Sequence, residues 1–93
     1  MVYLVTYNLH SSDAFFLIER TLRNYNFVKL NDFTYLVNTL ESVDEFHTHL
    51  ADGMYHRDGV YVSAVSKPIV WKGFPTNVSD WIIENLGKKN NVN

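Results

Sequence analysis

The sequence contains no cysteine among its 93 residues. The chain therefore has no disulfide, no thiolate metal ligand and no cysteine nucleophile. It also lacks a long apolar run, because no stretch approaches the ~20 residues that a membrane-spanning helix needs. Its first residues, VYLVTY, have the pattern of a strand and no basic stretch before them. We therefore expect no secretory signal, no membrane partner and a cytoplasmic protein.

Positive charge is scarce and scattered. Eight Lys and Arg residues against ten Asp and Glu residues give a formal net charge of −2. A dedicated duplex-DNA-binding protein carries a basic stripe, which this sequence does not have. Basic residues can gather only locally, and Arg20 and Arg23 in one predicted helix are the candidate nucleic-acid contacts. The charge pattern thus disfavours strong non-specific binding of nucleic acid.

Apolar and aromatic residues are abundant, at 46% and 15% of the chain. A chain of this length forms one domain, and its composition is sufficient for a packed core. We assign residues 1–87 to this domain and residues 88–93 to a polar tail. Six Tyr and six Phe are many for so small a protein, so we expect part of the aromatic surface to contact a partner.

The hydrophobic periodicity predicts an α+β fold. A capping box of Ser42 and Glu45 marks the start of the second of its helices. The predicted order is a strand at 2–9, a helix from about 13 to 24, strands at 27–30 and 33–39, a helix after residue 42, a strand at 59–65, a short fifth strand at 69–71 and a C-terminal helix at 78–86. The first six elements have the ferredoxin-like order β-α-β-β-α-β, in which two helices cover one face of an antiparallel sheet.

The strands are apolar on both sides, so the sequence must also indicate which side the helices cover. Tyrosine is amphipathic and common at interfaces, which favours the tyrosine-rich side as the open face. The residues predicted on this open face are Tyr3, Val5, Tyr7, Phe33, Tyr35, Val37 and Tyr61. The residues predicted under the helices are Val2, Leu4, Leu36, Val60 and Val62. The alternative, in which the tyrosines complete the monomer core, stays open.

A homodimer through the open face follows from this assignment. The residues of the predicted dimer interface are Tyr3, Val5, Tyr7, Tyr35, Ile69, Val70 and Trp71. Trp71 also has a second interpretation, in which it forms a clasp with Trp81 that seats the last helix on the domain.

Three stretches of the sequence resemble a known group. "MVYLVTYNL", "FTYLVNT" and "SAVSKPIVWKGFPTNVSDWIIENL" are similar to the small bacterial and phage proteins called SinR-like, which in turn resemble the second CRISPR-associated protein family and virulence-associated protein D. The resemblance runs from about Met1 to Leu86. It implies a ferredoxin-like homodimer whose sheets pack together, with the segment after the fourth strand reaching onto the partner. Some of these relatives are metal-dependent nucleases, and others bind nucleic acid or protein.

The residue at the end of the first strand distinguishes the nucleases of this group from the binding proteins. In the nuclease-like relatives an aspartate closes this strand, and the dimer brings two such aspartates together around a divalent ion. Asn8 stands at that position here. Mg²⁺ prefers anionic oxygen ligands, and a neutral amide supplies only a weak carbonyl. We therefore predict no metal and no cofactor, and Mg²⁺ belongs only to the alternative in which the chain is a metal-dependent endoribonuclease or endodeoxyribonuclease.

Polar residues beside Asn8 are the remaining catalytic candidates. His10 and His56 could carry protons, since histidine titrates near neutral pH, and Asp13 could bind a cation if it left the helix start. Ser11 or Ser12 is expected to cap the first helix. The leading hypothesis is a non-catalytic homodimer that acts as a protein- or nucleic-acid-binding accessory factor of a phage or bacterium. The alternatives are the nuclease and a single-stranded-RNA-binding sheet, because RNA-recognition motifs share this topology.

Overall fold

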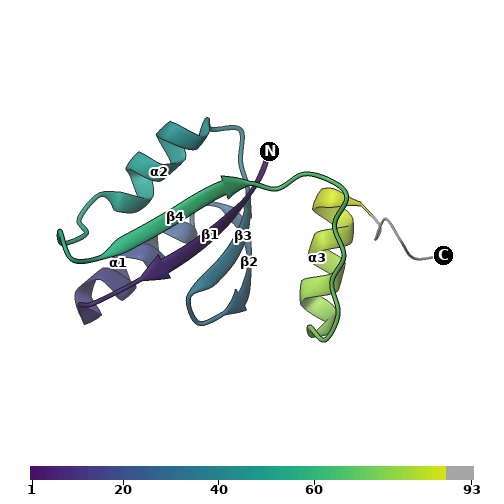
Figure 1. Cartoon of the computed structure of the whole chain (residues 1–93), viewed down its shortest axis with the longest axis horizontal. Coiled ribbons are helices and arrows are strands. Elements are labelled where there is room, and N and C mark those ends of the chain that lie inside the picture. Colours follow the sequence, from purple (N-terminus) through teal and green to yellow (C-terminus); the bar gives the residue numbers. More distant parts are fainter. Residues whose placement is uncertain (88–93) are drawn as a thin grey trace.

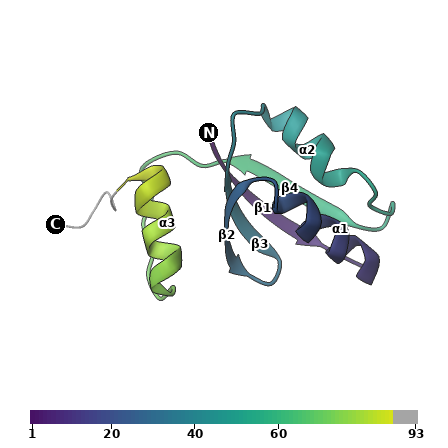
Figure 2. The same ribbon diagram turned by 180° about the vertical axis from the view of Figure 1, so that it is seen from behind.

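The computed structural model describes residues 1–87, so the polar tail predicted at 88–93 lies outside the described residues. The elements are β1 (Val2–Asn8), α1 (Ser12–Leu22), β2 (Asn26–Asn31), β3 (Thr34–Asn38), α2 (Val43–Ala51), β4 (Gly59–Ala64) and α3 (Thr76–Leu86). The four strands form one antiparallel sheet in the order β2-β3-β1-β4, which makes the fold α+β and is compatible with a ferredoxin-like arrangement. Helices α1 and α2 lie on one side of the sheet and α3 lies on the other (Figure 1, Figure 2). In residues 1–87, no helix is both long and apolar enough to span a bilayer.

The core between the sheet and helices α1 and α2 is rich in tyrosine. Its buried members are Tyr3, Val5, Tyr7, Tyr35 and Val37 from the sheet, and Ile18, Leu22, Phe46 and Leu50 from the helices. The prediction that this side of the sheet is open was therefore wrong. Tyr3, Val5, Tyr7 and Tyr35 are inside the domain and are not available to a dimer interface.

The physical reason is that a tyrosine ring can be buried when its hydroxyl reaches a partner at the margin of the layer. The Tyr3 hydroxyl donates to the backbone oxygen of Glu41 at 2.8 Å. The Tyr35 hydroxyl donates to Glu19 Oε2 in α1 at 3.1 Å. The rings of Tyr3 and Tyr35 fill the space between the sheet and the helices, and their hydroxyls lie at the margin of that space.

A second buried cluster lies on the opposite face, under α3. Val2, Val28 and Leu36 of the sheet pack there against the buried α3 residues Val78, Trp81 and Ile82, with Leu4 at the margin. The prediction that Val2, Leu4 and Leu36 lie under α1 and α2 was thus wrong, because the side-chain alternation was assigned to the wrong face. Val60 and Val62 do pack against the first cluster, as predicted.

The segment between β4 and α3 forms no strand, so the fifth strand predicted at Ile69–Trp71 was wrong. Ile69 and Trp71 pack against the second cluster instead of pairing along a sheet edge. Pro68, which precedes them, has no N–H to donate to a ladder. The Trp71 indole donates to Ser79 Oγ at 3.0 Å, and the Trp81 indole donates to Asn26 Oδ1 at 2.8 Å. The predicted tryptophan clasp is confirmed.

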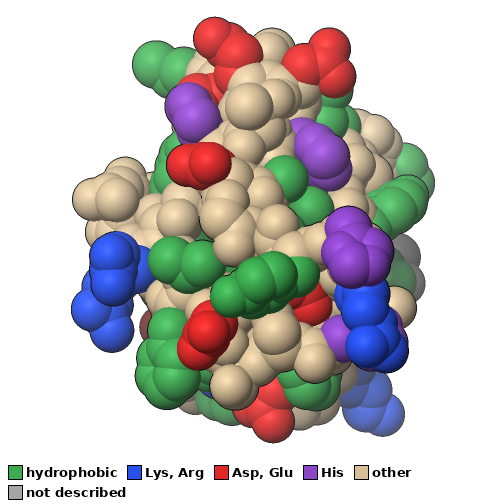
Figure 3. All heavy atoms as spheres, turned by 90° about the vertical axis from the view of Figure 1, so that its left-hand side faces the viewer, with side chains coloured by type: hydrophobic (Ala, Val, Ile, Leu, Met, Phe, Trp, Pro, Cys, Tyr) green, Lys and Arg blue, Asp and Glu red, His purple; other side chains and the backbone are tan. Residues whose placement is uncertain are grey.

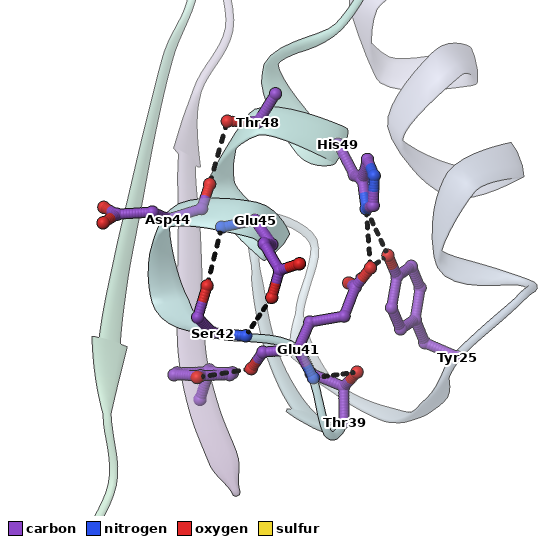
Figure 4. Close-up of polar contacts among 9 residues, drawn as sticks. Tyr25, Thr39, Glu41, Ser42, Asp44, Glu45, Thr48 and His49 are labelled. Atoms are coloured by element: carbon purple, nitrogen blue, oxygen red, sulfur yellow. Dashed lines mark hydrogen bonds and ion pairs between the residues drawn. The ribbon is translucent and has the colours of Figure 1, made fainter.

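Helix α2 begins at the predicted capping box (Figure 4). The Glu45 N–H donates to Ser42 Oγ at 3.2 Å, and the Ser42 N–H donates to Glu45 Oε1 at 3.0 Å. The hydrogen bonds from Ser42 hold the pKa of Glu45 below its ordinary value.

Candidate functional site

Two polar segments that are far apart in the sequence meet at the start of α1. Residues 10–13 and residues 55–58 line one depression with a volume of about 480 Å³. The pairing of β1 with β4 brings them together, because Asn8 lies opposite Gly59 at the end of the ladder. One segment continues into α1, and the other leads into β4. His10, Asp13 and His56, three candidates from the sequence, therefore share one site.

Asp58 holds this depression together. Its carboxylate accepts hydrogen bonds from the His10 N–H at 2.6 Å, the Ser11 hydroxyl at 2.9 Å and the Tyr55 N–H at 3.2 Å. These bonds, led by the one from His10, lower the pKa of Asp58 because they favour the charged carboxylate. Ser11 occupies the N-cap position of α1, but its side chain forms no hydrogen bond to the helix. The predicted capping role of the Ser11 hydroxyl was therefore wrong, because this hydroxyl binds Asp58.

An apolar depression of about 440 Å³ adjoins the polar one and shares residues 10–12 with it. It is lined by Leu9, Phe15, Phe16 and Phe33. Phe16 is 70% exposed and Phe33 is 50% exposed, which is unusual for such large apolar side chains. Figure 3 shows this end of the molecule, with hydrophobic side chains across its middle and His and basic side chains beside them. The sequence signal was the Phe15–Phe16 pair, since an amphipathic helix cannot bury both of two adjacent residues equally.

Asn8 does not join this site. It is exposed at the end of β1 and lines neither depression. Across the described part of the chain, no three or more His, Asp and Glu side chains are grouped so that they could hold a metal ion.

Arg20 lies further along α1 and Arg23 is the C-cap residue of that helix, and both are exposed. They follow Phe16 by four and seven positions, which places the three residues on one side of the helix. Arg23 also borders a small pocket of about 80 Å³ beside Tyr35.

A further polar cluster joins α2 to the start of β2 (Figure 4). The Tyr25 hydroxyl donates to Glu41 Oε1 at 2.6 Å and lies 3.2 Å from His49 Nδ1, which is 2.8 Å from Glu41 Oε2. Burial and the hydrogen bond to Glu41 raise the pKa of Tyr25 to about 12. No local motif could have predicted this cluster, because its members come from two different loops and from α2.

The second face of the sheet carries an apolar groove of about 250 Å³ beside α3. Its lining residues are Leu4, Leu30, Leu36, Val65, Ile69, Val70, Trp71, Phe74, Ile82 and Leu86. Val70 is 62% exposed at this groove. Tyr61, on the same sheet face through its pairing with Thr6, is 59% exposed. Three residues of the predicted interface, Ile69, Val70 and Trp71, thus line an accessible groove.

Comparison with known proteins gave no match to a protein-family model, to a curated protein or to a solved structure. We therefore infer function from the geometry of the chain itself.

Proposed function

We propose that this chain is a ferredoxin-like, non-catalytic homodimer that acts as a binding accessory factor, and that the two copies meet through the second face of the sheet. The strand order β2-β3-β1-β4, with α1 and α2 on one face, supports the ferredoxin-like arrangement. Burial of the tyrosine-rich side leaves, as accessible sheet surface, the part of the opposite face that α3 does not cover, where Asn8 and Tyr61 are exposed.

The observation that carries the proposal is the absence of charge on the strands of this face. The register places one set of side chains on it: Val2, Leu4, Thr6, Asn8, Asn26, Val28, Thr34, Leu36, Asn38, Gly59, Tyr61 and Ser63. None of these described strand residues is charged. A second copy carries the same net charge of −2, so the two copies approach best where no like charges oppose each other.

The shape of this face also suits a second copy. A two-fold interface uses the same patch on both partners, so the patch must contain both a projection and a hollow. Exposed Val70 and Phe74 stand at the rim of the apolar groove on the same surface. Exposed apolar side chains beside a hollow are the usual core of an interface.

The metal-dependent alternative has less support. Asn8 offers a neutral amide, and it lies outside the depression that gathers His10, Asp13 and His56. A binding role requires no such ligand.

Sedimentation velocity tests the proposal. The wild-type chain is expected to sediment as a dimer of twice 10.8 kDa at micromolar concentration. Val70→Glu should give a monomer, because burying an unpaired carboxylate against apolar surface costs several kcal/mol. Val43→Glu is the matched control, since Val43 is 41% exposed at the start of α2 and lies on the other side of the sheet. A monomeric wild type, or equal dissociation of both variants, would contradict the proposal.

A further inference from the structure

All three arginines of the chain lie on or beside α1. Arg20 lies on the helix, Arg23 is its C-cap residue, and Arg57 lines the polar depression at its start. All three are exposed, and within residues 1–87 none of them forms an ion pair or a hydrogen bond through its side chain. An unpaired guanidinium group can bind a phosphate through two parallel hydrogen bonds.

The neighbouring carboxylates are largely occupied. Glu19 accepts the hydrogen bond from the Tyr35 hydroxyl, and Asp32 pairs with Lys29 at 3.6 Å. Asp58 accepts three hydrogen bonds from its own loop and from the start of α1. Among the described acidic residues that flank this surface, Asp13 is the one without such a partner. These interactions leave the carboxylates charged but hold three of them on partners other than the arginines, so the three guanidinium groups remain unpaired and available to a ligand.

Exposed aromatic rings lie between these cations. Phe16 and Phe33 line the same apolar depression, which adjoins the one lined by Arg57. Arg20 and Arg23 follow Phe16 along one side of α1 for about 10 Å, given the helical rise of 1.5 Å per residue. Aromatic rings flanked by arginines form the usual platform for unpaired bases, which stack on the rings while their phosphates bind the cations.

We propose that this surface binds single-stranded nucleic acid, with bases stacked on Phe16 and Phe33 and phosphates bound by Arg20 and Arg57. A duplex fits poorly, because its bases are already stacked and three arginines form no continuous stripe. The surface lies on the α1 side of the sheet, opposite the face proposed for dimer contact. The two proposals therefore succeed or fail separately.

Fluorescence anisotropy of a labelled oligouridylate tests the proposal. We expect the single-stranded RNA and the matching single-stranded DNA to bind at micromolar protein, and a duplex of the same length to bind at least about tenfold more weakly. Phe16→Ala should weaken binding by about tenfold or more, since each stacked base contributes about one such factor. Leu40→Ala is the control, because Leu40 is a fully exposed apolar side chain in the loop before α2, outside both proposed surfaces, and it should bind like the wild type.

Charge variants provide the second readout. Arg20→Gln should lower the slope of log affinity against log salt concentration by about one, as expected for one lost phosphate contact. Lys72→Gln, which removes an exposed cation from the segment before α3, should leave that slope unchanged. Asp13→Asn should tighten binding several-fold, because it removes the unpaired carboxylate beside the phosphates.

Four results would overturn the proposal. Three of them are no binding by the folded wild type, duplex binding as tight as single-strand binding, and equal affinity for Phe16→Ala and Leu40→Ala. An acidic peptide that competes as well as the oligonucleotide would also overturn it, since the arginines would then act without the rings.

Discussion

Asp58 joins two loops through hydrogen bonds, a structural role that its neighbours in the sequence do not indicate. It stands in the triplet His56–Asp58, immediately before β4, where a hairpin-like entry to the strand is the simplest interpretation. The structure instead joins its carboxylate to His10, Ser11 and Tyr55. The polar cluster after β1 is therefore a hydrogen-bonded junction between two loops, which fixes the geometry of the depression that they line.

This junction makes stability depend on pH. The pKa of Asp58 is lowered in the folded protein, so its contribution is present above the ordinary aspartate pKa of about 3.9 and is lost as the pH falls through the lower folded value. Asp58→Asn should lower the melting temperature at pH 7, and this difference should shrink in acid below about pH 3.9. Thermal unfolding at several pH values measures it, with Asp80→Asn as a control at an exposed site in α3. A difference that persists unchanged in acid would show that the charge of Asp58 is not the cause.

The tyrosines illustrate a limit of residue-level prediction. Alternation correctly placed Tyr3, Tyr7 and Tyr35 on one face and Leu4 and Leu36 on the other, but it could not tell which face the helices α1 and α2 cover. These tyrosines were predicted to be exposed because their hydroxyls are polar. Two of the three hydroxyls form hydrogen bonds at the margin of the buried layer. The Tyr7 hydroxyl is buried with no hydrogen-bond partner in the described residues, and burial raises the pKa of Tyr7. The contacts of the Tyr7 ring, and not its hydroxyl, therefore hold this residue in the core.

Helices and strands with local signals were predicted well. The capping box of Ser42 and Glu45 forms as predicted, and Gly53 follows α2 with a positive φ of 83°. Helix α3 begins at Thr76, two residues before the predicted start. The fifth strand failed because a strand needs a pairing partner, and no local pattern specifies one. Ile69 and Trp71 are β-forming residues that pack as isolated apolar side chains.

The seating of α3 can be tested separately from the main core. Trp81 is 9% exposed and belongs to the cluster with Val2 and Val28, not to the tyrosine core. Trp81→Ala should lower the free energy of unfolding by about 3–5 kcal/mol, as expected for a buried aromatic side chain. Ile83→Ala is the control, because Ile83 lies in the same helix but is 45% exposed, and it should cost under about 1 kcal/mol. Urea unfolding measures both, and equal effects would place α3 outside the packed structure.

For the molecule as a whole, the sequence located part of the candidate site. His10, Asp13 and His56 were singled out separately, and the β1–β4 register brings them into one depression. Tyr55 and Arg57 were not predicted, because their contribution depends on that long-range pairing. Arg20 and Arg23 were predicted as contacts, but the exposed rings of Phe16 and Phe33 beside them emerge only from the packing of α1 on the sheet.

The most direct test of the account is to locate the contact between two copies of the chain. An isotope-filtered NOE experiment on an equal mixture of labelled and unlabelled protein detects only contacts between molecules. We predict intermolecular NOEs from the methyl groups of Val70 and Leu4, which line the apolar groove, and from the ring of Tyr61 on the same uncharged sheet face. The methyl groups of Ile18 and Leu50, buried in the tyrosine core, should show none. Intermolecular NOEs confined to α1 and α2 would contradict the proposed dimer. So would the absence of any intermolecular NOE at a concentration at which Val43→Glu and the wild type sediment alike.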